Sequence, residues 1–360
     1  MNKIKPVFMV SFAFILMVLL FPLLVTKTPG LEAEITEPEI TKTPVPTAEL
    51  WMRAEVIQPE DRLPDKPEEY DTAIYIKLIS KDGLSSAFTL RDYLIGVVAA
   101  EMPALFEPEA LKAQAVAART YSIYRMKADQ VHEGGALCSD PGCCNAYLTD
   151  EALKEKWGAD YEANLARITG AVLQTDGICL SYNNEPIFAA FHSSSVEKTE
   201  NSESVWRNAL PYLRSASSIE DEDSVPNYIS RVTISYKEIQ SLVKEAYPKA
   251  KLSSKPEGWL TGAEYTENGR LIKVSLGGVE LKGTELRALL KLRSTAVTWR
   301  FLNDGIMFET KGYGHGVGMS QYGANAMAKR GADYQEILMH YYTDVDITVI
   351  STLLDENDSV

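Results

Sequence analysis

The chain is poor in cysteine and histidine, with four of each among 360 residues. Four cysteines are too few for the disulfide framework that supports small secreted domains without a large core. Lysine and arginine are outnumbered, 36 against 50 aspartates and glutamates, which gives a formal net charge of −14. No basic stripe is visible along the sequence, and this argues against a nucleic-acid partner. The hydrophobic fraction of 45% is ordinary, so the chain can build a globular core.

Motifs of several common enzyme classes are also missing. The sequence has no Gly-x-Ser-x-Gly segment, the nucleophile elbow of many serine hydrolases. Its glycine-rich segment at 312–318 is not followed by Gly-Lys-Ser/Thr, which excludes a P-loop, and no His-Glu-x-x-His zinc motif is present. The adjacent His192 and Ser193 do not suggest a nucleophile with its base, because neighbouring residues on a strand point to opposite faces.

The first 30 residues are expected to anchor the chain in a membrane. Lys3 and Lys5 precede an uncharged run from Pro6 to Val25, and about 20 apolar residues suffice to cross a bilayer as a helix. A cleaved signal peptide is the alternative, but its apolar core is shorter, roughly 7–15 residues. The two lysines place the N-terminus in the cytoplasm. We therefore expect a single-pass protein of the cell membrane whose folded part is extracytoplasmic.

Residues 31–72 are expected to form a disordered linker. This segment holds 12 acidic residues against 4 basic ones, and seven prolines fall within 26–72. Proline-rich segments with an excess of one charge are extended and do not pack into a core. We assign 73–350 to the folded domain, with an inserted lobe at about 213–300, and 351–360 to a C-terminal tail.

The pattern of apolar residues and helix breakers predicts an α+β fold with short antiparallel sheets. Thr89-x-x-Asp92 resembles a capping box and starts a helix that Pro103 stops after Glu101. Pro108 fits the first turn of a second helix, which runs to about residue 128. The other expected elements are a strand at 73–80, a helix ending near 174, a hairpin turning at Asn183-Asn184, alternating strands and short helices over 228–310, and a final pair of helices after the glycine-rich loop.

Glu101 is the most informative single residue. It ends an apolar helix, in the segment 97–103. Apolar neighbours desolvate its carboxylate and the helix C-terminus presents partial negative charge, and both effects raise its pKa. A raised pKa suits a general acid that works near neutral pH. The local sequence leaves open the alternative of a glutamate that turns to solvent at a frayed helix end.

His132, Cys138, Cys143 and Cys144 form a candidate metal site. One histidine and three cysteines within thirteen residues match the ligand set of a closed tetrahedral zinc site. Four protein ligands leave no open position, so such a zinc ion is structural rather than catalytic. The alternatives are a disulfide from Cys138 to Cys143 or Cys144, and free thiols. Cys179 stands alone in a strand-like segment and is expected in the core.

Four segments together resemble the stage II sporulation protein D family of lytic transglycosylases. The resemblance covers roughly 74–348, and the segments follow one another in the family's order. They are Asp92–Pro103, Ala110–Tyr121, His192-Ser193 and Gly314–Ala324. The membrane anchor and the linker also suit the family. The resemblance implies an α+β domain whose helices and short sheets form a long substrate groove.

The resemblance implies that Glu101 is the catalytic residue. It also implies that a set of polar residues lines the groove for the glycan: Gln114, Arg119, His192, Ser193, Ser195, His315, Ser320 and Gln321. It supports zinc as well, since some family members hold zinc with a His-x5-Cys-x4-His-Cys pattern, in which Cys143 replaces the second histidine here. One departure follows His192. The family usually has two glycines where this chain has Val196 and Glu197, which leaves the role of Ser195 open.

The implied reaction cleaves the bond between N-acetylmuramic acid and N-acetylglucosamine in peptidoglycan and leaves 1,6-anhydro ends. The implied substrate is denuded glycan, and the implied partners are a cell-wall amidase and a membrane protein of the engulfment complex in sporulation. The folded part then lies between the mother-cell and forespore membranes. One alternative is a hydrolase with a second carboxylate, for which Glu107, Glu109 and Glu200 are candidates. The other is a non-catalytic scaffold that binds glycan for the amidase.

Overall fold

The computed structural model describes residues 69–80, 83, 85–127, 132, 137–140, 142–220 and 222–354. The expected anchor at 1–30, the linker up to residue 68 and the tail from 355 lie outside the described residues. Within the described part of the chain, no helix is both long and apolar enough to cross a bilayer.

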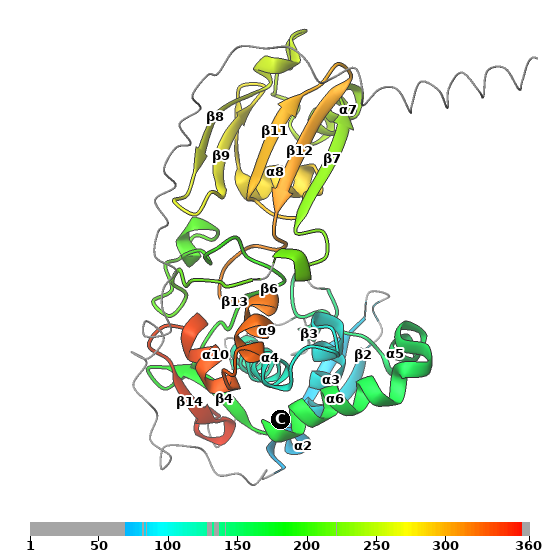
Figure 1. Ribbon diagram of the computed structural model, residues 1–360, viewed down its shortest axis with the longest axis vertical. Coiled ribbons are helices and arrows are strands. Elements are labelled where there is room, and N and C mark those ends of the chain that lie inside the picture. Colours follow the sequence, from blue (N-terminus) through cyan, green and yellow to red (C-terminus); the bar gives the residue numbers. More distant parts are fainter. Residues whose placement is uncertain are drawn as a thin grey trace, which may run out of the picture. The chain divides into compact units, whose positions relative to one another are not determined.

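The described residues form the expected mixture of helices and short sheets (Figure 1). The α-helices are α2 (Tyr70–Ala73), α3 (Leu90–Glu101), α4 (Pro108–Lys127), α5 (Asp150–Trp157), α6 (Tyr161–Gln174), α7 (Tyr236–Ala246), α8 (Gly283–Leu289), α9 (Gln321–Lys329) and α10 (Tyr334–Tyr341). The first of these, α2, falls at the end of the segment that we expected to be linker.

The strands make five small sheets. They are β1 (Tyr75–Ile79) with β2 (Ser85–Thr89) and β3 (Leu137–Cys138); β4 (Ile178–Tyr182) with β5 (Glu185–Pro186) and β14 (Asp346–Val349); β6 (Phe191–His192) with β13 (Met319–Ser320); β7 (Ile229–Ser235) with β11 (Val297–Phe301) and β12 (Gly305–Lys311); and β8 (Leu260–Tyr265) with β9 (Leu271–Leu276) and β10 (Val279–Lys282). The expectation of antiparallel sheets is wrong for two pairs, β1–β3 and β6–β13, which are parallel. Long stretches of chain separate the members of each pair, as parallel pairing requires.

Local signals account for where the elements begin and end. The Thr89 hydroxyl accepts a 3.1 Å hydrogen bond from the Asp92 N–H and caps α3, as expected. The expected single helix ending near 174 is instead the pair α5 and α6, because Gly158 adopts a positive φ of 51° between them. The hairpin turn at Asn183 and Asn184 is confirmed, with φ of 54° and 61°, but its second strand is only two residues long.

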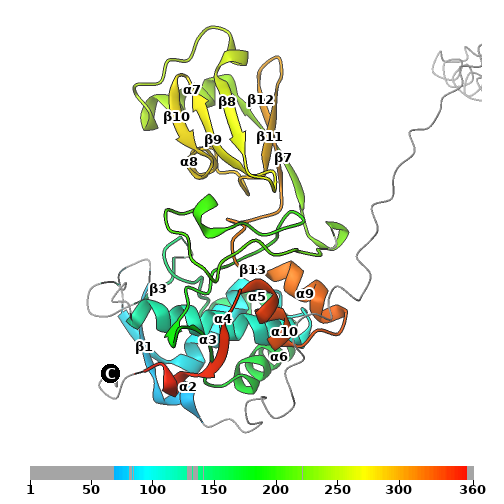
Figure 2. The same cartoon turned by 90° about the vertical axis from the view of Figure 1, so that its left-hand side faces the viewer.

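Helix α4 is the central element of the first hydrophobic core. It contacts α3, α6, α9, α10 and β4 (Figures 1 and 2). Its alanines at 113, 115, 117 and 118 are fully buried. Such small side chains let several neighbours approach one helix closely. This packing brings the C-terminal end of α3 and the N-terminal end of α9 to the same helix, although 220 residues separate Glu101 from Gln321.

A second hydrophobic core gathers residues between Ile234 and Phe308. It is formed by the sheet β7–β12–β11, the sheet β8–β9–β10 and helices α7 and α8. Strand β12 follows residue 300 but pairs with β7 along its whole length. The expected lobe boundaries of about 213 and 300 stay a prediction.

Candidate active site

Glu101 is the last residue of α3, and its side chain is half-buried at a depression of about 430 Å³. The depression is lined by Ala100, Glu101, Met102, Pro103, Ala104, Leu105, Lys156, Trp157 and Asn164. Among these described lining residues, Glu101 is the single acid. Burial raises the pKa of its carboxyl group, while hydrogen bonds from Ala146 and Gln321 oppose the rise. The site therefore holds one carboxyl group whose pKa is shifted in the direction that proton donation near neutral pH needs.

Two donors orient the Glu101 carboxyl group. The Ala146 N–H donates to Oε1 at 3.0 Å, and the Gln321 side-chain amide donates to Oε2 at 3.3 Å. Gln321 opens helix α9, whose N-cap is Ser320, and it lies 3.5 Å from Oε1 of the fully buried Gln114. Three of the predicted groove residues thus lie at or beside the predicted acid.

The backbone that carries Ala146 is fixed on α3 by an aromatic contact. Tyr147 stacks on Tyr93 with ring centroids 5.9 Å apart, and its ring covers Gly96. A Cβ atom on Gly96 would lie 2.3 Å from this ring, so only glycine fits under Tyr147. The Leu148 N–H also donates to the Gly96 carbonyl at 3.3 Å. The segment from Ala146 to Leu148 is therefore held against the helix that ends in Glu101.

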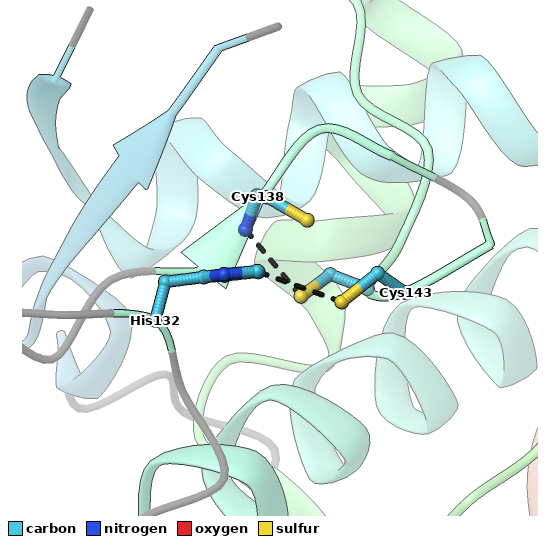
Figure 3. A group of neighbouring side chains, drawn as sticks. His132, Cys138 and Cys143 are labelled. Atoms are coloured by element: carbon cyan, nitrogen blue, oxygen red, sulfur yellow. Dashed lines mark hydrogen bonds between the residues drawn. The ribbon is translucent and has the colours of Figure 1, made fainter. Parts of the chain in front are cut away.

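The predicted metal ligands come together directly upstream of that segment. One ligand atom from each of His132, Cys138, Cys143 and Cys144 lies within 4.8 Å of all the others, so the cluster can hold a metal ion. Figure 3 shows the His132 ring pointing at the sulfur atoms, and Nε2 lies 3.4 Å from the Cys143 sulfur. All four cysteines of the chain are free thiols. One nitrogen and three sulfur donors at this spacing fit a tetrahedral zinc site.

Helix α4 supports the cysteine loop from the other side. Arg125 and the Tyr121 hydroxyl both donate to the Cys143 carbonyl, at 2.7 and 3.2 Å. Burial raises the pKa of the Cys144 thiol to about 12, so this thiol stays protonated unless a cation stabilises the thiolate. The metal cluster is thus connected through Asn145 to Ala146, whose N–H donates to Glu101.

His192 and Ser195, two other predicted groove residues, form a buried pair. His192 Nδ1 lies 3.1 Å from the Val317 carbonyl, which accepts only, so Nδ1 carries the proton. Nε2 then accepts from the Ser195 hydroxyl at 2.8 Å. Burial lowers the pKa of His192 well below its usual value, helped by the charges of His315 and Arg270. Ser195 is fully buried, and so the pair braces the site rather than offering a nucleophile.

The glycine-rich loop carries His315 beside this pair. His315 is half-buried, its ring lies 5.5 Å from that of His192 and 5.1 Å from that of Trp206, and its Nδ1 accepts from the Val317 N–H at 3.1 Å. Burial lowers the pKa of His315, as do Arg287 and Arg270. The loop needs glycine at residue 318, where φ is 69° and a Cβ atom would lie 2.0 Å from the Ala190 carbonyl oxygen.

Glu220 is a functional candidate that the sequence did not reveal. Its Oε1 accepts from the Ser195 N–H at 2.5 Å, from the Ser218 hydroxyl at 3.0 Å and from the Ser320 hydroxyl. Burial raises the pKa of Glu220 to about 7, against these hydrogen bonds. Ser320 also caps α9, where its hydroxyl accepts from the Gly323 N–H at 3.2 Å. Glu220 thus ties Ser195 to the turn that presents Gln321.

Ser193 contributes its backbone to the same network. Its carbonyl accepts from the Tyr322 N–H at 3.0 Å and lies 3.4 Å from the Ser320 hydroxyl. A single serine or glutamate in a loop gives no sequence signal for such a role. Lys156 is also unforeseen: it lines the Glu101 depression and donates to the Ala99 carbonyl at 2.9 Å.

The structure does not bring Arg119 to Glu101 or to the other predicted groove residues. Its guanidinium is fully buried and forms an ion pair of 2.6 Å with Asp71, which is also fully buried. It further donates to the Ile178 carbonyl at 3.0 Å. These contacts place Arg119 in the core, with none of its surface available to a ligand.

The three glutamates considered as second acids do not line the depression in the described structure. Glu109 binds Lys112 at 2.7 Å, and the Glu107 N–H donates to the Asn325 side chain at 2.8 Å. Glu200 is buried, accepts from Thr266 at 2.9 Å and lies 4.0 Å from Arg270. In the segment with Val196 and Glu197, Glu197 adopts a positive φ of 55°.

Comparisons with known proteins agree with these segments. The profile of the family described as Stage II sporulation protein matches residues 82–182. The stage II sporulation protein D of Bacillus amyloliquefaciens is 42% identical over 272 residues, which cover 74% of this chain and 76% of that protein. The protein of the same name from Bacillus subtilis (strain 168) is 42% identical over 270 residues, with the same coverage of 74% and 76%. The amidase enhancer of Bacillus subtilis (strain 168) is 29% identical over 357 residues, which cover 79% of this chain and 46% of that protein.

Proposed function

Because the chain belongs to the stage II sporulation protein D family, we propose that it is a lytic transglycosylase that cleaves peptidoglycan glycan strands in sporulation. The observation that carries the proposal is the state of Glu101. Its carboxyl group has a raised pKa, is oriented by two donors and is the single acid among the described residues that line its depression. A hydrolase of the usual kind needs two carboxyl groups across the scissile bond, whereas a transglycosylase can work with one.

Glu101 acts first as an acid and then as a base. The protonated carboxyl group donates its proton to the oxygen that links N-acetylmuramic acid to N-acetylglucosamine, and the bond from that oxygen to C1 breaks. The resulting carboxylate removes the proton from the muramyl C6 hydroxyl as its oxygen attacks C1. The product carries a 1,6-anhydro end, and no water is consumed.

The two donors suit both halves of this cycle. Burial favours the protonated carboxyl group at the start, and the Ala146 N–H and the Gln321 amide stabilise the carboxylate after the proton has left. Lys156 lies at the same depression as a positive charge, and Trp157 beside it offers an aromatic surface for a sugar ring.

We propose that the cysteine cluster binds zinc with a structural role. Zinc held by His132, Cys138, Cys143 and Cys144 has no open position, so it supplies no chemistry to the reaction. It fixes the loop whose next residues lead to Ala146. The Tyr121 and Arg125 contacts to the Cys143 carbonyl would orient that ligand from behind, as outer contacts do in other zinc sites.

The proposed setting follows from the N-terminal segment and the relatives. An anchor at 1–30 and a linker from residue 31 to the start of the folded domain would hold the enzyme at the cell membrane with its domain outside, between the mother-cell and forespore membranes. One relative is named amidase enhancer, which supports cooperation with a cell-wall amidase. We propose denuded glycan as the substrate, with that amidase and a membrane protein of the engulfment complex as partners.

Mass spectrometry of denuded glycan strands digested by the full chain tests the reaction. We expect anhydro-muramic ends from the wild type and from Glu162→Gln, which changes an exposed glutamate of α6, and none from Glu101→Gln. Reducing ends that depend on Glu101 would mean a hydrolase and a second carboxylate. Binding of strands without any Glu101-dependent cleavage would leave the glycan-binding scaffold as the function.

A further inference from the structure

Three arginines, Arg270, Arg287 and Arg293, lie near the glycine-rich loop, and Arg270 is the one of them that has acidic partners among the described residues, Glu200 and Glu220. The charges of Arg287 and Arg270 both act on His315, and that of Arg270 acts on His192. Arg270 is buried and has Glu200 at 4.0 Å as its ion-pair partner. Arg287 donates to the Leu292 carbonyl at 3.2 Å and forms no ion pair among the described residues. In the described part of the chain, Arg287 and Arg293 therefore leave positive charge without an ion pair beside this loop, in a chain with a net charge of −14, and this favours an anionic ligand.

Arg293 is the arginine of this neighbourhood that lies against exposed surface. Its guanidinium stacks over the ring of Tyr313, with Cζ 4.1 Å from the ring centroid. Tyr313 belongs to the glycine-rich loop and is 44% exposed. Arg293 forms no ion pair with any described carboxylate, and its Nε is buried without a hydrogen-bond partner. A guanidinium that is held in place and left unpaired is suited to a planar anion such as a carboxylate.

Tyr322 relates this pair to Glu101. The charge of Arg293 acts on Tyr322, the residue after Gln321, and Gln321 donates to Glu101. The Tyr322 ring packs edge-to-face on Phe106, with centroids 4.9 Å apart, and Phe106 follows Leu105 of the Glu101 depression. Arg293 is therefore within electrostatic range of Tyr322, and the residue before Tyr322 binds the Glu101 carboxyl group.

We propose that Arg293 and Tyr313 form a subsite that binds the free lactyl carboxylate of an N-acetylmuramic acid residue near the cleaved bond. This inference rests on the proposed function, since it takes the glycan strand as the substrate. The carboxylate pairs with Arg293, and the exposed part of Tyr313 contacts the sugar ring. In a strand that still carries stem peptides, the same carboxyl group is an amide and has no charge. The subsite therefore discriminates denuded strands from peptide-bearing ones and from chitin, which lacks the lactyl group.

Binding to two forms of one glycan tests the subsite without any cleavage. The full chain with Glu101→Gln is titrated with denuded strands and with the same strands after their carboxylates have been converted to methylamides. We expect Arg293→Gln to weaken binding of the denuded strands about tenfold and to leave binding of the amidated strands unchanged. Arg300→Gln, which removes an exposed arginine from β11, is the matched control and should bind both forms as its parent does.

The opposite outcomes are distinct. An equal loss of affinity for both glycan forms would show that Arg293 supports only the conformation of the loop. Equal affinities of variant and parent would show that Arg293 does not touch the strand. Either result overturns the subsite. If the glutamine variant melts at a lower temperature, the comparison is repeated with Arg293→Lys. This variant should bind denuded strands with an affinity between those of the parent and of Arg293→Gln. If wild-type protein prefers the carboxylate form through Arg293 but makes no anhydro ends, the transglycosylase fails while the subsite stands.

Discussion

The backbone N–H of Ala146 lies 3.0 Å from Oε1 of Glu101, and Ala146 follows the last cysteine of the metal cluster by two residues. The loop that carries three of the metal ligands therefore continues directly into a hydrogen-bond donor to the carboxyl group that we propose as the catalytic acid. A donor at this position lowers the pKa that burial raises. The position of the loop thus sets both the orientation and the acidity of Glu101, and changes in the loop should alter the reaction without contact to the substrate.

Substitution of Gly96 should show this dependence. Gly96→Ala places a Cβ atom 2.3 Å from the Tyr147 ring, so the ring and the adjoining Ala146 must move. We expect the rate of anhydro-end formation to fall about tenfold, since the loss of one hydrogen bond to a charged group costs about 1.5 kcal/mol. Rates and melting temperatures are measured together on the purified protein.

The control for Gly96 is another helical glycine. A Cβ atom added to Gly170 in α6 would meet no atom within 4 Å, so the alanine variant gains only helix propensity, up to about 1 kcal/mol. An unchanged rate in Gly96→Ala with a well-folded protein would mean that the Ala146 contact is not needed for catalysis.

The metal cluster should affect stability and activity together. Prolonged treatment with a strong chelator is expected to lower the melting temperature and the rate, and added zinc should restore both, because metal binding contributes to folding free energy. Cys144→Ala should lose bound zinc, measured by elemental analysis, whereas Cys143→His should keep it, since zinc accepts either ligand. Cys179→Ala removes a fully buried cysteine outside the cluster and should keep the metal. Full activity of Cys144→Ala without zinc would contradict the structural role.

The sequence predicted those parts of the site that depend on local signals. A capping threonine, an apolar helix and Pro103 were enough to place Glu101 at a helix end, and residue types and spacing were enough for the metal cluster. The contact of Gln321 with Glu101 joins residues that are 220 positions apart, and no local sequence pattern predicts it. It depends on the packing of α3 and α9 on α4, which the sequence alone does not give.

Asp71 and Glu220 escaped the sequence analysis for a related reason. Asp71 was assigned to the acidic linker by composition, yet it is fully buried, because its charge is matched by Arg119 from α4. Glu220 stands in an acidic loop where nothing distinguishes it from its neighbours. Its role follows from donors that come from Ser195, Ser218 and Ser320, which only the fold brings together.

Glu220 should make the stability of the domain depend on pH. Its pKa is about 7 in the folded protein against an ordinary 4.5, so the folded state binds the extra proton between these values. The contribution of Glu220 to the free energy of unfolding is therefore complete below pH 4.5 and is lost as the pH rises through 7. The glutamine of Glu220→Gln cannot titrate. The free energy of unfolding of this variant, relative to that of wild type, should therefore rise by about 2 kcal/mol between pH 5 and pH 8.

The measurement is urea denaturation of wild type and variant at pH 5, 6, 7 and 8. Glu257→Gln, which changes an exposed glutamate, should run parallel to wild type over the same range. A Glu220→Gln curve that also runs parallel to wild type would show that Glu220 is ionised throughout, with its pKa near the ordinary value.

Removal of the Arg119–Asp71 ion pair should separate a structural role from substrate binding. Asp71→Ala leaves a fully buried guanidinium without its partner, which should cost about 3–5 kcal/mol. Replacement of both residues, Asp71→Leu with Arg119→Met, removes the uncompensated charge and should recover most of that loss. The exposed pair of Lys154 and Asp150 is the control, and its removal should not change stability measurably.

The double variant decides what Arg119 does. If the arginine serves only the core, the folded double variant should cleave denuded glycan with the KM of the wild type, since Arg119 has no exposed surface. A KM at least tenfold higher at wild-type stability would instead show that Arg119 reaches the glycan, as the family resemblance implies. That result would require the core around α2 and α4 to open when substrate binds, because Asp71 and the Ile178 carbonyl occupy the guanidinium in the structure.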